Sequence, residues 1–242
     1  MDKVAVVIPA YNEQDDLEQS VRILYDFLQS NGLQGYDIII ADNNSTDSTP
    51  DIAQKLVEED MAKYHFVQIQ GKGAAIKETW LSPKYDDYDY YAFMDADLAT
   101  DLNALPRLIE GLRQGKGHNY GLAIGSRYIE GAQIERDPFR LFVSRTYRLL
   151  FSLLGTKVKD PQCGFKAVTK EVRDNVVTKI KNNAFIFDTE LIYSTQKAGY
   201  NVKEIPVYWE ERQGSTVNLK RDVPKFLYGL AGLLYERLTS KQ

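Results

Sequence analysis

The sequence is poor in the residues that form disulfides and zinc sites. Its 242 residues include one cysteine, Cys163, and two histidines, His65 and His118. One cysteine cannot form a disulfide within the chain, and it is compatible with a reducing, intracellular setting. Two histidines in unrelated segments argue against a zinc site built from His and Cys.

Long hydrophobic runs are also absent. No stretch of about 18 or more apolar residues occurs, so we expect no transmembrane helix. The first residues, MDKVAVVIPAYNE, lack the basic start and long apolar core of a signal peptide. The formal net charge of -4 gives no support for nucleic acid as a partner. We therefore expect a cytoplasmic protein whose membrane contact, on the cytoplasmic face, is peripheral.

The first half of the sequence alternates between strand and helix patterns. Short apolar runs, such as Val4–Ile8, Tyr36–Asp42 and Tyr88–Met94, are typical of buried strands. Between them, apolar residues recur at helical spacing, as in the segments 17–28 and 103–113. This alternation predicts an α/β fold, with a Rossmann-like, mostly parallel sheet and helices on both faces.

The second half is less regular and contains no obvious linker or repeat. We expect helices over Asp137–Leu154, Thr169–Ile180 and Asp188–Ala198, a strand over Val202–Trp209, and a terminal amphipathic helix over Val223–Leu238. We therefore predict a single domain over residues 1–242. Its first half would be 1–127, and 128–242 would be an elaboration with C-terminal amphipathic helices.

Polar residues gather where the predicted strands end. Four strands are followed by PAYNE, ADNNSTDST, DADLATD and GSR. Ligands of open α/β sheets bind beyond the carboxyl ends of the strands. Taken singly, NNSTDS could be a solvated turn, and DADLATD a strand-to-helix turn with Asp101 as the N-cap. Four such ends at one edge favour a binding site.

Two of these segments indicate particular chemistry. Asp95 and Asp97 are two residues apart, so on an extended chain they point the same way, as ligands of a divalent cation would. In QGKGAAIKE, two glycines would let the backbone approach an anion, while Lys72 adds charge at a helix N-terminus. A plain glycine turn with an exposed lysine is the alternative. The absence of G-x-G-x-x-G and G-x-x-x-x-G-K-[ST] disfavours dinucleotide-binding and P-loop proteins.

The order of these motifs resembles a known family. VVIPAYNE, IIIADNNSTDST, GKGAAI, DAD and GSR are similar to the motifs of family 2 glycosyltransferases of the GT-A fold. The later KDPQCGFKA, FIFDTELIY and VKEIPVYWEERQGS resemble dolichyl-phosphate glucosyltransferases most, and dolichyl-phosphate mannose synthases next. The resemblance covers roughly Val4–Ser215 and implies glycosyltransferase activity.

The resemblance also implies how a nucleotide-sugar donor is bound, with UDP-glucose favoured over GDP-mannose. Pro9, Tyr11 and Glu13 would line the nucleoside, Asp42 would accept a hydrogen bond from the base, and Lys72 would approach the diphosphate. Glu13 could instead be a first-turn acid favoured by the helix dipole.

The same resemblance assigns the metal and the catalytic residues. Asp97 would bind Mg²⁺ or Mn²⁺, and Asp95 would contact the sugar or the metal shell, because these hard cations prefer oxygen ligands. Arg127 and Asp160 complete the predicted catalytic set, with Asp160 shaping the site.

A polyprenyl (dolichyl-type) phosphate is the implied acceptor. Arg127, Arg140 and Ser144 would hold its phosphate, with Lys166 adding positive charge, and Arg136, Arg145 or Arg148 could replace Arg140. The helix that carries these residues also offers an apolar face, which could lie in a membrane interface or in the protein core. That face comprises Phe139, Phe142, Val143, Tyr147, Leu150, Phe151 and Leu154.

The implied acceptor simplifies the chemistry. A phosphate monoester has a second pKa of about 6, so it is largely dianionic at neutral pH and needs no general base. We therefore expect inverting transfer of a hexose, with a β product from an α-linked donor. One rival is transfer to a saccharide hydroxyl, with Asp188, Glu190 or Asp160 as base, although Asp188 and Glu190 could equally be N-caps. The other rival function is that of a non-catalytic protein that binds a nucleotide-sugar.

Overall fold

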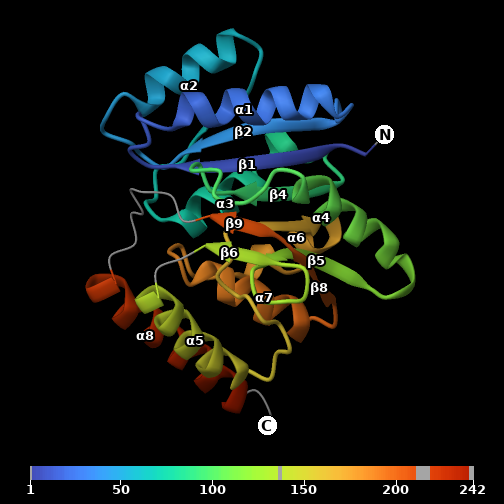
Figure 1. Ribbon diagram of the computed structural model, residues 1–242, viewed down its shortest axis with the longest axis vertical. Helices are drawn as coiled ribbons and strands as arrows, with labels where there is room; N and C mark the ends of the chain where they lie inside the picture. The colour runs from blue at the N-terminus through green and yellow to red at the C-terminus, as the bar shows by residue number, and fades with distance from the viewer. Residues whose placement is uncertain (1, 136–137, 211–218, 240–242) are drawn as a thin grey trace.

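The computed structural model describes residues 2–135, 138–210 and 219–239. Its main sheet has seven strands: β1 (Val4–Ala10), β2 (Tyr36–Asp42), β3 (Lys63–Phe66), β4 (Tyr90–Met94), β5 (Tyr120–Ser126), β7 (Phe165–Thr169) and β8 (Asn201–Pro206). The spatial order is β3-β2-β1-β4-β7-β5-β8, and only β7 runs antiparallel to its neighbours (Figure 1). A second, two-stranded sheet pairs β6 (Gln133–Glu135) with β9 (Tyr208–Glu210). The predicted mostly parallel α/β fold is confirmed.

Helices cover both faces of the main sheet. One face packs against α1 (Leu17–Ser30), α2 (Thr49–Glu58) and α4 (Ala104–Arg113). The other packs against α3 (Lys72–Leu81), α6 (Lys170–Asn175) and α7 (Phe187–Lys197). The two remaining helices, α5 (Pro138–Ser152) and α8 (Leu219–Thr239), lie side by side at one end of the molecule (Figure 1).

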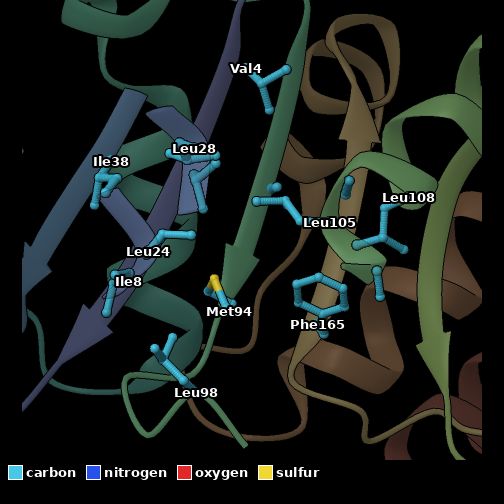
Figure 2. Packing of buried hydrophobic residues seen from close by; sticks show 14 of the residues in the cluster. Val4, Ile8, Leu24, Leu28, Ile38, Met94, Leu98, Leu105, Leu108 and Phe165 are labelled. Atoms are coloured by element: carbon cyan, nitrogen blue, oxygen red, sulfur yellow. The ribbon is translucent and has the colours of Figure 1, made fainter. Parts of the chain in front are cut away.

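Strand β1 shows why the sheet is buried on both faces. Its alternate residues Val4 and Ile8 join the cluster drawn in Figure 2, with Met94 and Phe165. Val7, which points the other way, joins the opposite cluster. A continuous apolar strand is therefore required here, since both faces exclude water.

Strand β7 was not predicted. It begins at Phe165 and ends at Thr169, where the sequence pattern predicts the start of a helix. Lys166 interrupts its apolar run, so neither strand period nor continuous hydrophobicity marks it. Both β7 and β8 lie beyond residue 127, so the main sheet draws on both halves of the chain. The division into two functional halves stays a prediction.

The predicted apolar face of α5 is corrected in part. Phe151 and Leu154 are buried in the core cluster, and Tyr147 and Leu150 pack against it. The exposed apolar side chains nearby are instead Leu149 and Leu153. Within the described ranges, no helix is both long and apolar enough to cross a membrane.

One side of α8 docks on the protein. Leu230 and Leu233 are buried, and the Phe226 ring lies 5.7 Å from the Tyr147 ring of α5. A Cβ at Gly229 would lie 2.7 Å from Ile186 Cγ1, whereas one at Gly232 would meet nothing within 4 Å. Close packing at Gly229 therefore sets the distance of α8 from the start of α7.

These two glycines offer a matched test of that docking. Gly229→Ala should lower the free energy of unfolding by about 1–2 kcal/mol, because the methyl group overpacks the contact with Ile186. Gly232→Ala should raise it by about 0.5–1 kcal/mol, because alanine is the better helix former and space is open. Urea unfolding of the two variants measures both. Equal effects would contradict a close approach of α8 at Gly229.

Candidate active site

The carboxyl ends of β1, β2 and β4 meet at one edge of the sheet because these strands are parallel neighbours. The antiparallel strand β7 brings its opposite end to the same edge, where Phe165 pairs with Met94. Asp95 therefore lies against the turn before β7. A Cβ at Gly164 would overlap the Asp95 carboxylate, so only glycine leaves room for it there.

The loops after β1 and β2 are joined by hydrogen bonds. The Asn12 backbone N–H donates to Ser45 Oγ at 3.1 Å, and the Thr46 N–H donates to Asn12 Oδ1 at 2.8 Å. The Glu13 N–H donates to Thr49 Oγ1 at 2.8 Å. These bonds hold together the two segments predicted to bind the nucleoside.

Asp42 is more enclosed than the sequence suggested. Its side chain is 0% exposed; its Oδ2 accepts from the Tyr64 hydroxyl at 2.7 Å, and its Oδ1 accepts from the Ser45 N–H at 3.0 Å. A nucleobase would reach this carboxylate only if the Ser45 loop moved. Pro9 is half-buried, whereas Tyr11 is 46% exposed and accessible to a ligand. The nucleoside contacts stay predictions.

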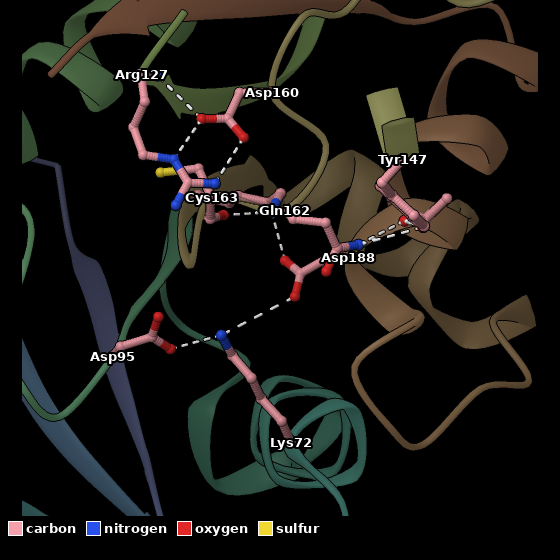
Figure 3. A network of polar contacts seen from close by, with 10 residues as sticks. Lys72, Asp95, Arg127, Tyr147, Asp160, Gln162, Cys163 and Asp188 are labelled. Carbon is pink, nitrogen blue, oxygen red and sulfur yellow. Dashed lines mark hydrogen bonds and ion pairs between the residues drawn. The ribbon is translucent and has the colours of Figure 1, made fainter. Parts of the chain in front are cut away.

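Lys72 points at the acidic strand end rather than into solvent (Figure 3). Its Nζ donates to Asp95 Oδ1 at 2.5 Å and lies 4.0 Å from Asp188 Oδ2. Burial lowers the pKa of Lys72, but Asp95 and Asp188 outweigh this, so the pKa lies above its ordinary value. Lys72 is therefore a fixed positive charge next to Asp95.

The glycines that flank Lys72 serve packing. A Cβ at Gly73 would lie 2.5 Å from Phe187 Cβ, and one at Gly71 would overlap the Asn183 carbonyl oxygen. The Ala74 N–H at this helix start donates to that same oxygen at 2.9 Å. The predicted reason for these glycines, close approach of an anion, is thus corrected: the approaching group is the backbone before α7.

Asp188 is buried between two lysines (Figure 3 shows its contact with Lys72). Its Oδ1 accepts from Nζ of Lys166, which is 0% exposed and also donates to the Cys163 carbonyl at 2.5 Å. In this conformation an acceptor phosphate cannot touch Lys166. The predicted contribution of Lys166 to phosphate binding is therefore limited to its charge, acting at a distance. Asp188 has a structural partner that the sequence did not reveal.

The predicted capping roles in α7 are wrong. The N-cap residue is Ile186, and Asp188 and Glu190 lie inside the first turn. Glu190 accepts from the backbone N–H groups of Lys181 and Asn182 at 3.0 and 3.1 Å. It therefore holds the segment that packs on the start of α3.

Arg127 and Asp160 form a buried bidentate pair (Figure 3). Arg127 Nε donates to Asp160 Oδ2 at 2.7 Å, and Nη2 donates to Oδ1 at 2.8 Å. The Arg127 backbone N–H also donates to Oδ2 at 2.9 Å. Burial would raise the pKa of the Asp160 carboxyl, but the Arg127 guanidinium holds it below its ordinary value. Asp160 is thus ionised and fully engaged.

The predicted phosphate-binding residues of α5 are only partly described. The side chain of Arg140, and all of Arg136, lie outside the described part of the chain. Ser144 and Arg148 are half-buried, and Arg145 is exposed. Tyr147 is anchored to α7, since its hydroxyl lies 2.7 Å from Thr189 Oγ1 (Figure 3).

Acidic groups converge on the loops after β1 and β4. Burial, together with the nearby charges of Asp16, Asp97 and Asp95, raises the pKa of Glu13 to about 7. The alternative of Asp101 as the N-cap of α4 is wrong, because the cap residue is Asn103, whose N–H donates to Asp101.

This surplus of negative charge fits a divalent cation. No group of three or more Asp, Glu, His or Cys in the described residues could hold a metal alone. Asp95 and Asp97 would thus supply two oxygen ligands, and the rest would come from a diphosphate and water, as is usual for Mg²⁺. The Asp95 side chain is 45% exposed, which leaves it accessible.

The structure also reveals contributors that sequence reasoning missed. Asn43 Nδ2 donates to the Ile69 carbonyl at 2.7 Å, and its Oδ1 accepts from the Gly71 N–H at 2.5 Å. Asn43 thereby fixes the start of α3 relative to β2. Its only signal in the sequence was its position directly after Asp42 at a strand end.

Removal of the Asp188 charge should destabilise the protein strongly. Asp188→Asn leaves Lys166 buried without an anion, so the free energy of unfolding should fall by about 3–5 kcal/mol. Asp87→Asn breaks an exposed pair with Lys3 and should leave the free energy of unfolding almost unchanged. Urea unfolding compares the two. Similar small losses in both variants would contradict a buried ion pair at Asp188.

Glu13 should make the metal-free protein less stable as the pH rises. Its pKa of about 7 lies above the ordinary 4.5, so the folded state binds the extra proton between these values. Its contribution to stability therefore falls as pH increases from about 4.5 to 7 and is constant above. Glu13→Gln should melt a few degrees higher than the native protein at pH 8, with no such advantage at pH 4.5. Melting curves in a chelator measure this, and a gap independent of pH would disprove it.

Known proteins resemble this chain in sequence and in fold. Residues 5–177 match the model of the family described as glycosyl transferase family 2. Glycosyltransferase AglD of Haloferax volcanii is 35% identical over 225 residues, covering 91% of this chain and 35% of AglD. Dolichyl-phosphate beta-glucosyltransferase of Dictyostelium discoideum is 27% identical over 227 residues, covering 89% of this chain and 68% of that enzyme. Dolichol-phosphate mannosyltransferase of Pyrococcus furiosus is 34% identical over 181 residues, covering 72% of this chain and 48% of that enzyme.

Among solved structures, glucosyl-3-phosphoglycerate synthase from Mycobacterium tuberculosis with UDP superposes with a TM-score of 0.68 and 21% identity. The match covers 98% of this chain and 80% of that one, and it establishes a shared GT-A-type fold. The chain spans about a third of the length of AglD and about half of the mannosyltransferase. The family match covers most of the chain, including the loops that carry Glu13, Asp95 and Asp160, and the chain belongs to glycosyl transferase family 2.

Proposed function

We propose that this protein transfers a hexose from a nucleotide-sugar to a polyprenyl phosphate, with inversion and with Mg²⁺ or Mn²⁺. Glucose from UDP-glucose is favoured, and mannose from GDP-mannose is the alternative donor. Relatives named as dolichyl-phosphate beta-glucosyltransferases align with about nine-tenths of the chain, which supports the lipid phosphate and the sugar.

The observation that carries the choice of acceptor is the state of the candidate bases. Asp160, Asp188 and Glu190 are 1%, 3% and 6% exposed, and each is engaged by groups of the protein. A sugar hydroxyl must lose a proton during transfer, which needs a free base. A phosphate dianion needs none. Buried, occupied carboxylates therefore favour the phosphate acceptor.

The donor would lie across the carboxyl ends of β1, β2 and β4. Tyr11 is exposed beside Glu13 and would cover the nucleoside. Asp97 would hold the metal, with Asp95 at the sugar or the metal shell, and the metal when bound would neutralise charge on the departing diphosphate. Lys72 is held at this point by Asp95 and would add a second positive charge near the diphosphate.

The acceptor would approach from the side of α5. Arg127, kept in place by Asp160, is assigned to its phosphate together with Arg140 and Ser144. We assign the lipid chain to a peripheral membrane contact on the cytoplasmic face. Exposed apolar side chains on α5, directly after it and on α8 support this contact: Leu149, Leu153, Leu227, Tyr228 and Leu238.

A hydroxyl acceptor is the second candidate, and one observation favours it. Glu13 has a pKa of about 7, which suits a general base at neutral pH. Its place among Asp95 and Asp97 is on the donor side, where a cation would lower that pKa again. The phosphate acceptor therefore remains our proposal.

A transfer assay tests the proposal. Purified protein is incubated with Mg²⁺ or Mn²⁺, a short polyprenyl phosphate in detergent, and either UDP-glucose or GDP-mannose. We expect a lipid-phosphate hexose by mass spectrometry from one donor, with at least a hundredfold loss in Asp97→Ala.

The controls separate the alternatives. Asp101→Ala changes a neighbouring acid outside the assigned site and should keep activity. Hydrolysis of the donor without glycolipid would refute the lipid acceptor and favour a hydroxyl or water. If neither donor is hydrolysed and no hexose is transferred from either, hexose transfer from these nucleotides is refuted.

A further inference from the structure

Two arginines share one aromatic ring beside the candidate site. The guanidinium carbon of Arg148, on α5, lies 3.8 Å from the centroid of the Tyr128 ring. The guanidinium carbon of Arg127 lies 5.6 Å from the same centroid. The fold therefore concentrates two positive charges around Tyr128, although like charges repel and each must lose water to lie there.

Of these two charges, only that of Arg127 is neutralised by a carboxylate of the described residues. Asp160 pairs with Arg127, Asp188 with Lys166, and Asp95 with Lys72. Among the residues that the structure describes, Arg148 has no carboxylate partner, and the Tyr128 ring is its contact. A half-buried guanidinium without an anion is an energetic cost that a bound anion would remove.

Unpaired polar atoms mark the same place. Arg148 Nε and the Tyr128 hydroxyl are buried, and neither has a hydrogen-bond partner in the described structure. Ser126 Oγ, at the end of β5 two residues before Tyr128, is in the same condition. Each such group destabilises the fold while it stays unsatisfied, because it has lost its bonds to water. Native proteins leave few of them, so three around one segment indicate a missing ligand.

We infer that Arg148, stacked on Tyr128, is a further arginine of α5 that binds the phosphate monoester of the acceptor, in addition to Arg140. This inference rests on the proposed function and assigns a residue to its acceptor site. A guanidinium stacked on a ring keeps its N–H donors in the plane, free to form two parallel bonds to phosphate oxygens. The dianion would balance the charge of Arg148 and satisfy Nε.

The position of Arg148 in α5 fits this role. Ser144 lies one turn earlier, on the same side of the helix, and both are half-buried. Phe151, three residues on, is buried, whereas Arg145 and Leu149 are exposed. Arg148 thus faces the protein, and the predicted Arg140–Ser144 stripe continues through it.

Arg148 is also close to the donor side through its neighbour. Tyr147 lies 2.7 Å from Thr189 Oγ1, and Thr189 follows Asp188, which is 4.0 Å from Lys72. This chain of contacts ties the middle of α5 to the lysine assigned to the diphosphate. The helix that carries Arg148 is therefore held in place by the same segment that carries Asp188.

Direct binding without donor tests the assignment. The dissociation constants of a short polyprenyl phosphate, the matching polyprenol and inorganic phosphate are measured by calorimetry in detergent. Arg148→Gln should weaken the binding of both phosphates about 10- to 100-fold and leave the binding of the polyprenol unchanged. Arg145→Gln removes the same charge from an exposed position of α5 and should bind phosphate almost as the native protein does. Arg148→Lys, which keeps the charge but not the stacked plane, should lie between, and it replaces Arg148→Gln if that variant does not fold.

Each outcome has a meaning. Tighter binding of the polyprenyl phosphate than of inorganic phosphate, with both dependent on Arg148, supports a lipid headgroup at this site. Equal binding of the two assigns the site to free phosphate and overturns the acceptor role. Unchanged binding in Arg148→Gln, or equal losses in Arg145→Gln, overturns the site. If Arg148→Gln makes glycolipid with an unchanged KM for the acceptor, this inference alone is refuted. If phosphate binding depends on Arg148 but no hexose is transferred, the proposed function alone is refuted.

Discussion

The carboxylate of Asp188 joins three parts of the candidate site that come from distant parts of the chain. Lys166 reaches it from β7, Lys72 approaches it from α3, and Asp188 itself begins α7. A lysine in the middle of a sheet can stay charged at 0% exposure only beside an anion. The antiparallel strand that completes the sheet therefore depends on where α7 starts, and so does the position of Lys72 next to Asp95.

The start of α7 is in turn determined by backbone packing. Phe187 lies where a side chain at Gly73 would have to be, and the Asn183 carbonyl lies against Gly71 and accepts from Ala74. Glycines beside a lysine at a helix start are usually interpreted as a cradle for an anion. Here they admit another segment of the same chain, and the anion that Lys72 meets is a carboxylate of the protein. The electrostatics of the site thus follow from a steric requirement.

The part of the fold that could be predicted from sequence is the part with periodic apolar patterns. β1, β2 and β4 are continuous apolar runs, and their polar ends correctly indicated where Asp95 would lie. β7 could not be predicted, because Lys166 hides it and its partner Asp188 is 22 residues away. The Arg127–Asp160 pair, 33 residues apart, was equally invisible as a pair, although both residues were selected. Motifs identify residues at strand ends, but only tertiary contacts show which charges are already matched.

The unmatched charges of the site have opposite signs at its two sides. Around Glu13, Asp95 and Asp97 the excess is negative, and together with burial, the larger cause, it raises the pKa of Glu13 to about 7. Around Arg148 the excess among the described residues is positive. A nucleotide-sugar carries a negative diphosphate and would be repelled by the acidic side unless a cation accompanied it. A phosphate monoester would be attracted to the basic side without any metal. On the proposed function, the electrostatic field of the protein therefore separates two anionic substrates before either makes a specific contact. The metal is what allows the donor, rather than the acceptor, to occupy the acidic side.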